Sequence, residues 1–194
     1  ATDNSVMVIN TAGFCTEEVS NHAIMFILSC AKKLTMLNDL TKNGKWGSET
    51  GSVTSDMVPI TDQTLRLVSL GNIGRAVARK AQALGMNVIA YDPYVQPWVA
   101  KEYRVELVSS LKELASRSDF VSMHTPLNNQ TRHLVGSDFF KAMKPTAYFI
   151  NTCRGGTVDE DALINALKTN EFAGAGLDVF DIEPTPTDNP LFQM

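Results

Sequence analysis

From residue 64 to residue 179, short apolar runs alternate with longer amphipathic segments. Short apolar runs there predict buried strands, and the amphipathic segments between them predict helices. The expected strands are 64–70, 87–91, 105–108, 120–124, 147–150 and 173–179. The expected helices are 73–84, one from the capping box Ser110-x-x-Glu113, one near 137–143, and one from the capping box Thr157-x-x-Glu160 to Lys168.

Strands that are separated by helices run parallel, and a parallel sheet is covered by helices on both faces. The pattern therefore predicts an α/β fold with a doubly wound, open, twisted sheet. In such folds ligands bind in the crevice outside the carboxyl ends of the strands. That edge is where we look for chemistry.

The first part of the chain follows a different pattern. Val6–Ile9 reads as a short strand without a nearby partner, and Thr16 reads as the N-cap of a helix that runs toward Asn38. This helix is apolar on more than one face, which indicates burial on both sides. It is either a core helix or a helix that bridges two domains or two subunits. Residues 43–62 lack periodicity and are expected to form a loop.

Composition limits the classes of protein that remain. The chain has 194 residues, 44% hydrophobic and 20% charged, which is typical of one globular domain and excludes disorder. A net charge of −4 with scattered Lys and Arg gives no footprint for nucleic acid or an anionic membrane. No apolar run approaches the ~20 residues of a membrane span. The expected partners are small molecules.

The three cysteines and the first residues bear on location. Cys15, Cys30 and Cys153 have no metal-ligand spacing, so we expect no metal site, and residues 1–10 have no signal-peptide core. An odd number of unpaired cysteines suits a reducing compartment. We therefore expect a cytoplasmic protein.

A glycine-containing turn follows the first strand of the repeating part. Gly71 lies just after that strand, Gly74 lies in the first turn of the next helix, and Asp92 ends the following strand. This arrangement aims helix N–H groups at a pyrophosphate and a carboxylate at ribose hydroxyls, so it predicts NAD and disfavours the 2′-phosphate of NADP. The alternative is that the glycines serve strand–helix packing alone and Asp92 is a turn residue before Pro93.

Two residues depart from the usual fingerprint. Ser69 stands where the first glycine of G-x-G-x-x-G is expected. We expect it to keep a β-region conformation and to weaken NAD binding without abolishing it, because a positive φ would cost roughly 1–2 kcal/mol. Arg66 lies inside a strand that should be buried, and we expect its side chain to extend to solvent from the amino end of that strand.

Charged residues follow the last two strands. Arg154 comes after the strand 147–150, Asp178 lies at the end of the final strand, and Glu183 lies just past it. Parallel strands bring one cation and two carboxylates to the edge where the cofactor is expected. Each also has a plain alternative, since Arg154 can be a surface cation beside glycines and Glu183 a solvated acid before Pro184.

Four stretches together resemble one family. They are "LGNIGRAVARKAQALGMNVIAYDPY", "SDFVSMHTPLNNQTRHLV", "AYFINTCRGGTVDEDALINAL" and "GAGLDVFDIEP". In this order they are similar to the NAD-binding part of the D-isomer-specific 2-hydroxyacid dehydrogenases. Residues 8–34 also resemble that family's crossover from the substrate domain. The resemblance makes 1–15 a remnant of a substrate domain, 16–190 a Rossmann domain with crossover helix 16–38, and 191–194 the start of a missing C-terminal segment.

The resemblance implies a role for each candidate residue. Arg154 would bind the substrate carboxylate, and Glu183 would pair with a catalytic His and raise its pKa. Asp92 would hold the ribose and Asp178 the nicotinamide carboxamide. The remaining cofactor-binding candidates are Gly71, Asn72, Ile73 and Gly74 in the phosphate turn, Thr152 and Cys153 at the nicotinamide, and His124, Thr125 and Pro126 in the wall of the cleft.

The family's catalytic His follows the Glu segment, and this chain ends before that position. His22, His124 and His133 all precede Arg154 and do not match it. We therefore expect an NAD-dependent oxidoreductase of D-2-hydroxy acids whose chain is truncated at both ends, inactive or nearly so alone and a homodimer when intact. The alternatives are an NAD-sensing corepressor-like module and a nucleotide-binding domain without a reaction.

Overall fold

A six-stranded parallel sheet forms the centre of the protein, in a computed structural model that describes residues 2–11 and 13–194. The strand order is β3-β2-β1-β4-β5-β6, and every neighbouring pair is parallel. The predicted doubly wound sheet is confirmed. The strands are β1 (Thr64–Val68), β2 (Asn87–Tyr91), β3 (Glu106–Leu107), β4 (Phe120–Met123), β5 (Tyr148–Asn151) and β6 (Gly174–Leu177).

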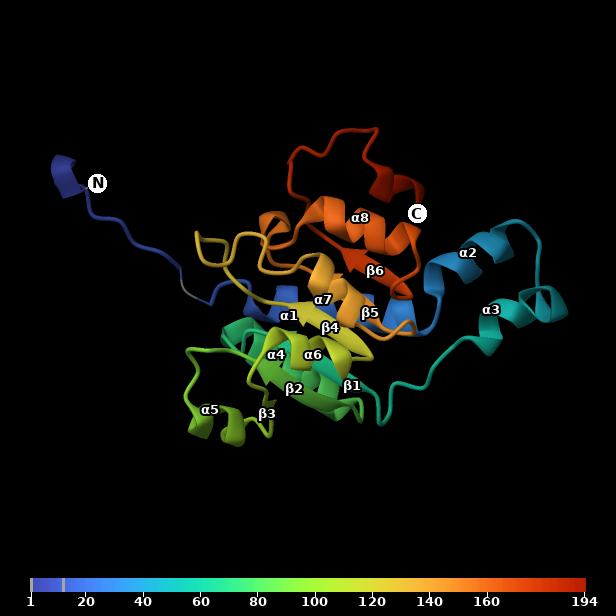
Figure 1. The fold of residues 1–194 in the computed structure, drawn as a ribbon, viewed down its shortest axis with the longest axis horizontal. Helices are drawn as coiled ribbons and strands as arrows, with labels where there is room; N and C mark the ends of the chain where they lie inside the picture. The colour runs from blue at the N-terminus through green and yellow to red at the C-terminus, as the bar shows by residue number, and fades with distance from the viewer. Residues whose placement is uncertain (1, 12) are drawn as a thin grey trace.

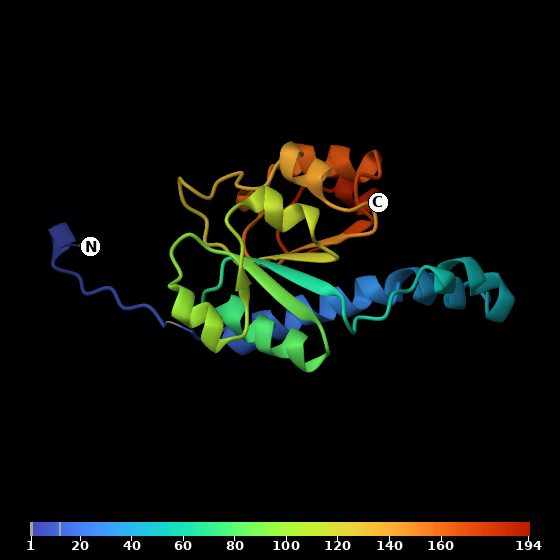
Figure 2. The same ribbon diagram turned by 60° about the horizontal axis from the view of Figure 1, so that its bottom comes forward.

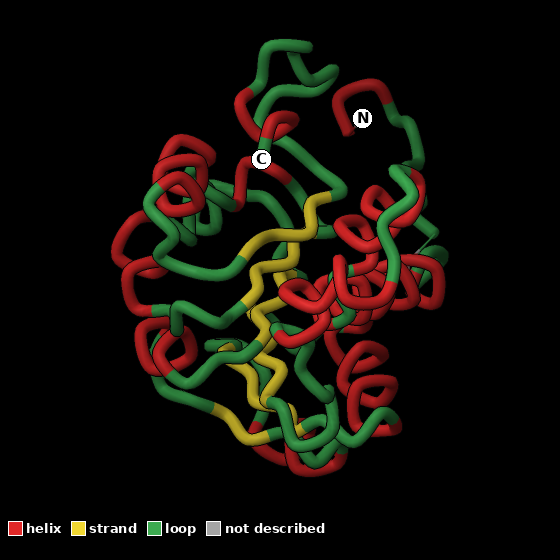
Figure 3. Tube along the Cα trace, turned by 90° about the vertical axis from the view of Figure 1, so that its right-hand side faces the viewer, coloured by secondary structure: helices red, strands yellow, loops and turns green. Residues whose placement is uncertain are grey.

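Helices cover both faces of the sheet (Figures 1 and 2). On one face lie α1 (Thr16–Ala31) and α4 (Asn72–Ala83), and on the other lie α6 (Leu111–Ser116), α7 (Ser137–Ala142) and α8 (Glu160–Lys168). Figure 3 shows the strands as a twisted band with helices on either side. Side chains alternate along β1, so that Leu65 and Leu67 join the α1/α4 core while Val68 joins the α6/α7/α8 core.

The predicted elements occur close to their expected positions, with two additions. Helix α5 (Pro97–Glu102) lies between β2 and β3, where no helix was expected. The expected loop 43–62 contains a 3-10 turn, η2 (Gly47–Thr50), and a short helix, α3 (Gly51–Ser55). Further 3-10 turns are η1 (Thr2–Asn4), η3 (Gly155–Thr157) and η4 (Pro190–Gln193). These pieces are too short to show a helical period in sequence.

The expected strand at Val6–Ile9 is not a strand. The segment is extended but exposed, with Met7 83% and Ile9 81% accessible. It leads away from the body of the domain (Figure 1). A β-strand needs a neighbour for its backbone hydrogen bonds, and the described chain places none beside it. The expected N-terminal strand in the fold class is therefore wrong for this structure.

The expected helix 16–38 is two helices, α1 and α2 (Leu34–Lys42). Lys33, with φ of 51°, separates them because a left-handed residue cannot continue a right-handed helix. The N-cap of α1 is Cys15 rather than Thr16. Helix α1 is buried along one stripe, whereas α2 has no buried residue and extends to one side of the sheet (Figures 1 and 2). Within this chain α1 is thus buried along one side only, and its bridging of two domains or two subunits stays a prediction.

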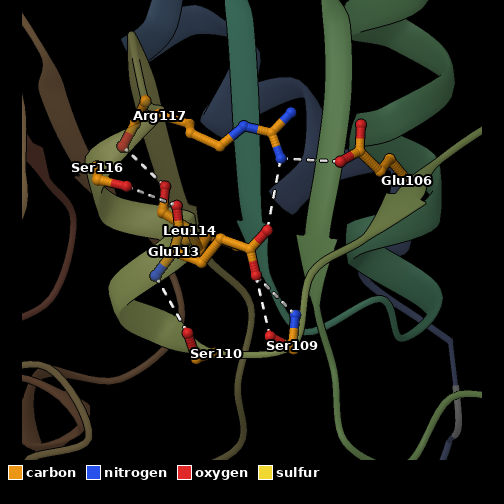
Figure 4. Close-up of polar contacts among 8 residues, drawn as sticks. Glu106, Ser109, Ser110, Glu113, Leu114, Ser116 and Arg117 are labelled. Carbon is orange, nitrogen blue, oxygen red and sulfur yellow. Dashed lines mark hydrogen bonds and ion pairs between the residues drawn. The ribbon is translucent and has the colours of Figure 1, made fainter.

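The two expected capping boxes differ in outcome. Ser110 caps α6 by accepting a hydrogen bond from Glu113 N at 3.2 Å, as expected, although the Glu113 carboxylate accepts from Ser109 rather than from Ser110 (Figure 4). At α8 the N-cap is Asp159, whose carboxylate accepts from Ala162 N. The box Thr157-x-x-Glu160 is wrong, because a nearer acid takes the cap and frees Glu160 for other partners.

Arg66 lies on β1 and is buried, so the expectation that its side chain extends to solvent is wrong. It is 1% exposed, lies in register with Ile89 and Val121, and its Nε and Nη1 have no hydrogen-bond partner in the described part of the chain. Arg117 lies nearby, held between Glu106 and Glu113 (Figure 4). Burial first, and then the charge of Arg117, lowers the pKa of Arg66 to about 10. Arg66 lies on the same face of β1 as Val68, and the α6/α7/α8 layer covers that face, so the side chain stays inside.

Candidate active site

The carboxyl edge of the sheet collects every loop that carries a candidate residue. Strand β1 lies at the centre, with β2 on one side and β4 on the other. The connections from these strands run in opposite directions across the sheet, which makes the end of β1 the topological switch point. Helix α4 begins there, with Gly71 as its N-cap, so its free N–H groups face this crevice.

The two glycines of the turn differ in their surroundings: Gly74 is closely packed and Gly71 has open space beside it. A Cβ on Gly74 would lie 2.4 Å from the carbonyl oxygen of Ser69, so no side chain fits there. A Cβ on Gly71 would meet only Ser69 Oγ, at 3.9 Å. Gly71 thus has open space beside it at the helix N-terminus, where a phosphate would bind, and Asn72 and Ile73 form the start of that helix.

Ser69 adopts the conformation of the glycine that it replaces. Its φ is 83°, so the expected β-region conformation is wrong. Ser69 N donates to Tyr91 O at 2.9 Å, and its hydroxyl donates to Asp92 Oδ2 at 3.1 Å. These bonds fix the turn and offset the roughly 1–2 kcal/mol that a side chain at positive φ costs.

Asp92 joins the turns after β1 and β2. Its Oδ2 accepts from Ser69 Oγ and from Leu70 N at 2.8 Å, and its Oδ1 accepts from Tyr94 N and Val95 N at 2.9 and 3.1 Å. A carboxylate has about four acceptor positions, and all are used. The turn role considered for Asp92 is therefore real. A ribose hydroxyl could bind Oδ2 only after the Ser69 hydroxyl rotates away.

Two buried side chains at this edge have unpartnered polar atoms. Both ring nitrogens of His124, 8% exposed, and Oγ1 of Thr152 lack partners among the described residues. His124 lies against the glycine turn, because a Cβ on Gly74 would be 3.9 Å from its Cδ2. Burial lowers the pKa of His124 to about 4, so the ring is neutral at pH 7. Such atoms are costly unless a ligand or water pairs with them.

The residues beside His124 complete this wall. Thr125 Oγ1 donates to the carbonyl of Val68 at 3.3 Å, and Pro126 O accepts from the hydroxyl of Thr131. The Thr125 bond ties the loop after β4 to the end of β1, and the Thr131 bond closes this loop on itself.

Asn151 shapes the turn that presents Arg154. Its amide donates to Arg154 O at 3.1 Å, and its Oδ1 accepts from Cys153 N at 3.0 Å and from the thiol at 3.1 Å. Burial raises the pKa of the Cys153 thiol, so it stays protonated at neutral pH. The guanidinium of Arg154 is exposed and bonds only the Cys153 carbonyl within the described residues. The fork is therefore available to a ligand.

Glu183 comes to the same edge from the loop after β6. A Cβ on Gly155 would lie 1.9 Å from the carbonyl carbon of Phe180, so the Arg154 turn and this loop are in backbone contact. Phe180 N donates to Glu183 Oε1 at 3.0 Å. In the part of the chain that is described, Arg154 and Glu183 form no ion pair with each other.

Asp178 has a partner that the sequence did not indicate. His22 Nε2, on α1, lies 3.2 Å from Asp178 Oδ1, and the His22 ring meets Phe26 edge-on. Phe26 in turn covers Gly176 of β6. The four-residue spacing of His22 and Phe26 placed both on one helix face, but nothing in the sequence located that face against β6.

The residues present fit a dinucleotide. The turn has an open glycine at the N-terminus of a 12-residue helix, and the unpartnered atoms of His124 and Thr152 line the same edge. Over residues 2–11 and 13–194, no helix is long and apolar enough to cross a membrane, and no group of His, Cys, Asp and Glu is arranged to hold a metal ion.

Comparison with known proteins decides the family. Residues 24–194 match the profile described as "D-isomer specific 2-hydroxyacid dehydrogenase, NAD binding domain". The chain belongs to this family. It is the NAD-binding domain, and the predicted cofactor NAD is confirmed with it.

Relatives and solved structures agree with this assignment. The domain is 39% identical to a glyoxylate reductase of Korarchaeum cryptofilum and 37% identical to a D-3-phosphoglycerate dehydrogenase of Methanocaldococcus jannaschii, over 194 residues each. These matches cover 100% of this chain but 58% and 36% of the relatives. The structure of D-mandelate dehydrogenase from Rhodotorula graminis matches with a TM-score of 0.89 and 34% identity, over 100% of this chain and 57% of that one. The domain thus spans between 36% and 58% of the length of these proteins.

Proposed function

We propose that this domain is the cofactor half of an enzyme that moves a hydride between NAD(H) and C2 of a D-2-hydroxy or 2-oxo acid. The observation that supports it is the gathering of Arg154, Glu183 and the glycine turn at one edge of the sheet. The relatives include a glyoxylate reductase, a hydroxypyruvate reductase and D-3-phosphoglycerate dehydrogenases. The proposed substrates are accordingly small 2-hydroxy and 2-oxo acids. The proposed location of the protein is the reducing cytoplasm.

The side chains suit these roles. When bound, nicotinamide supplies or accepts the hydride. The exposed fork of Arg154 can grip a planar carboxylate with two hydrogen bonds and so orient C2. Glu183 would hold an imidazole outside this chain in its protonated form, ready to give a proton to the 2-oxo oxygen. Asp178, Thr152 and Cys153 would border the nicotinamide, and Asp92 would favour NAD by repelling a 2′-phosphate.

Turnover of a hybrid enzyme tests the proposal. In it, residues 16–190 replace the matching segment of the Korarchaeum glyoxylate reductase, which supplies a substrate domain and a C-terminal segment. We expect NADH-dependent reduction of glyoxylate, and Arg154→Gln should lower kcat/KM for glyoxylate by about 100-fold or more. The control is Arg79→Gln, which removes a cation from the exposed face of α4. Equal rates with Arg154→Gln and Arg79→Gln would refute the role of Arg154.

Removing the Ser69 hydroxyl should tighten NADH binding to this chain. Ser69→Gly frees Asp92 Oδ2 for the ribose, so we expect the Kd for NADH to fall about three- to tenfold. It also relieves the positive φ, which should raise the free energy of unfolding. Ser69→Ala frees the same oxygen but keeps the strain, so it should tighten binding while leaving the free energy of unfolding unimproved. Fluorescence titration with NADH gives the Kd of each variant, and urea unfolding gives its free energy of unfolding. An unchanged Kd in Ser69→Gly would show that the hydroxyl does not compete with ribose.

We also propose that the intact protein is a homodimer. Helix α2 has no buried residue, and Leu34, Met36 and Trp46 on and after it are exposed apolar side chains. A second copy that covered this surface would remove it from water. Sedimentation velocity over a range of concentrations measures the oligomeric state, and a strictly monomeric intact protein would contradict this proposal.

A further inference from the structure

The loop that carries Glu183 is attached to the first turn of α8 by one side chain. Glu160 Oε2 accepts a hydrogen bond from the backbone N–H of Asp181 at 2.9 Å, and Glu160 Oε1 accepts from the side-chain amide of Asn189 at 2.8 Å. Glu183 lies between these two attachment points. A single carboxylate therefore holds the loop on both sides of the residue that the chemistry needs.

The second attachment point is itself well fixed. Asn189 is 9% exposed, and its Oδ1 accepts from Leu191 N at 2.9 Å while its Nδ2 donates to Glu160. Leu191 packs against the core on the α6/α7/α8 face. The chain after the loop is thus tied to the domain, and Glu160 transmits that attachment to the loop.

The first attachment point determines where the loop meets the Arg154 turn. Gly155 contacts the backbone of Phe180 and Asp181, and a Cβ on Gly156 would lie 3.1 Å from Asp181 Oδ1. Arg132 approaches the same carboxylate only at 4.0 Å and is largely exposed, so it adds little. With Asp181 N held by Glu160, the next N–H back along the chain, that of Phe180, donates to Glu183 Oε1.

Besides the Gly155 contact and the edge-on packing of Phe180 against Phe192, few contacts can order this loop. Asp181, Ile182, Glu183 and Pro184 are all exposed, so little apolar burial offsets the entropy of fixing them. Hydrogen bonds to a charged acceptor are stronger than neutral ones, and Glu160 makes two. Asp159 already caps α8, so the Glu160 carboxylate is not needed to start the helix.

We propose that Glu160 is a positioning residue that sets Glu183 beside the Arg154 turn. The inference rests on the proposed function, in which Glu183 supports a catalytic imidazole. In this role Glu160 acts through the loop, by its bonds to Asp181 N and the Asn189 amide. The acidic half of the active site is accordingly assembled within this domain, before any substrate domain closes over it.

Amide hydrogen exchange of the 194-residue chain tests this placement. The reporter is the N–H of Phe180, which bonds Glu183 and not Glu160. We expect Glu160→Gln to speed its exchange about tenfold or more. A glutamine has one oxygen that accepts, so its NH2 group would face either Asp181 N–H or the Asn189 NH2, both of which are donors, and one attachment would be lost. The control Asp161→Asn removes the same charge from the same turn of α8 without touching the loop and should leave the rate unchanged. The N–H of Val121 in β4 reports global opening.

Swapping the acid and the amide between positions 160 and 189 should restore the attachment, a rescue that general destabilisation would not show. In the double variant Glu160→Gln with Asn189→Asp, the new amide can donate to the new carboxylate while its oxygen still accepts from Asp181 N. We expect Phe180 exchange to return to within about threefold of the wild type, with Asn189→Asp alone fast. Asn189→Ala, which removes one attachment and adds no repulsion, should also be fast.

The outcomes separate the two proposals. A Phe180 rate in Glu160→Gln that stays within twofold of the wild type, or that rises together with Val121, would overturn the positioning role. So would a double variant that remains fast. Turnover by the hybrid enzyme carrying Glu183→Gln is a separate measurement. If its kcat and pH profile match those of the unmodified hybrid, the proposed role of Glu183 fails while the exchange data still decide what Glu160 does.

Discussion

Gly155→Ala is expected to destabilise the domain by at least about 3 kcal/mol. An added Cβ would lie 1.9 Å from both the carbonyl carbon and the oxygen of Phe180, and 2.4 Å from the nitrogen of Asp181. All three are backbone atoms, so no side-chain rotation relieves the overlap. The turn or the loop must move, at a cost at the upper end of overpacking in a dense interior.

The protein can respond to the added Cβ of Gly155→Ala in two ways. Either the whole domain loses stability, or the 178–190 loop detaches and the site is lost while the sheet survives. Urea unfolding measures the first, and exchange of Phe180 N–H measures the second. The matched control is Gly51→Ala in α3, where a Cβ meets nothing within 4 Å and where alanine should be neutral or stabilise by up to about 1 kcal/mol. A Gly155→Ala variant within about 1 kcal/mol of the wild type, with a slow Phe180 amide, would show that the turn can adjust.

The sequence was sufficient for the sheet and for the edge that carries the chemistry. Largely apolar strands such as Phe120–Met123 and Tyr148–Asn151, buried at every position, form only where both faces are covered, which indicates parallel strands between two helical layers. Once the strands are parallel, the residues after β1, β2, β4, β5 and β6 must share one edge. Arg154 and Asp92 could therefore be placed at the same edge without coordinates.

Contacts between distant segments decided what the sequence did not predict. The break at Lys33 accompanies a hydrogen bond from its side chain to the hydroxyl of Tyr148 on β5. The positive φ of Ser69 is fixed by Asp92, which lies one strand away. Each partner is far along the chain, and a local propensity carries no signal for it.

Similar local patterns also had different outcomes. Ser110-x-x-Glu113 and Thr157-x-x-Glu160 have the same signature, yet only Ser110 is an N-cap. At α8 the adjacent Asp159 takes the cap, and Glu160 binds a loop that arrives about twenty residues later. The same competition hid the role of Glu160 from sequence reasoning.

Acid is expected to destabilise the domain through His124. The pKa of this buried ring is about 4, whereas a histidine in the unfolded chain titrates near 6.5. Between these values the unfolded chain binds a proton that the folded domain excludes, so stability falls as the pH falls from about 6.5 to about 4. The linkage amounts to about 2 kcal/mol at pH 5 and about 3 kcal/mol at pH 4, relative to pH 7.

His124→Gln should remove this part of the pH dependence while keeping a polar side chain against the glycine turn. From pH 7 to pH 5 the wild type should therefore lose about 2 kcal/mol more unfolding free energy than the His124→Gln variant loses. His133→Asn is the control, because His133 is exposed and its left-handed backbone suits asparagine, so this variant should follow the wild type. Urea unfolding at half-unit steps of pH gives the curves. Parallel curves for the wild type and His124→Gln would mean that His124 accepts its proton in the folded domain as easily as in the unfolded chain, contrary to its burial without partners.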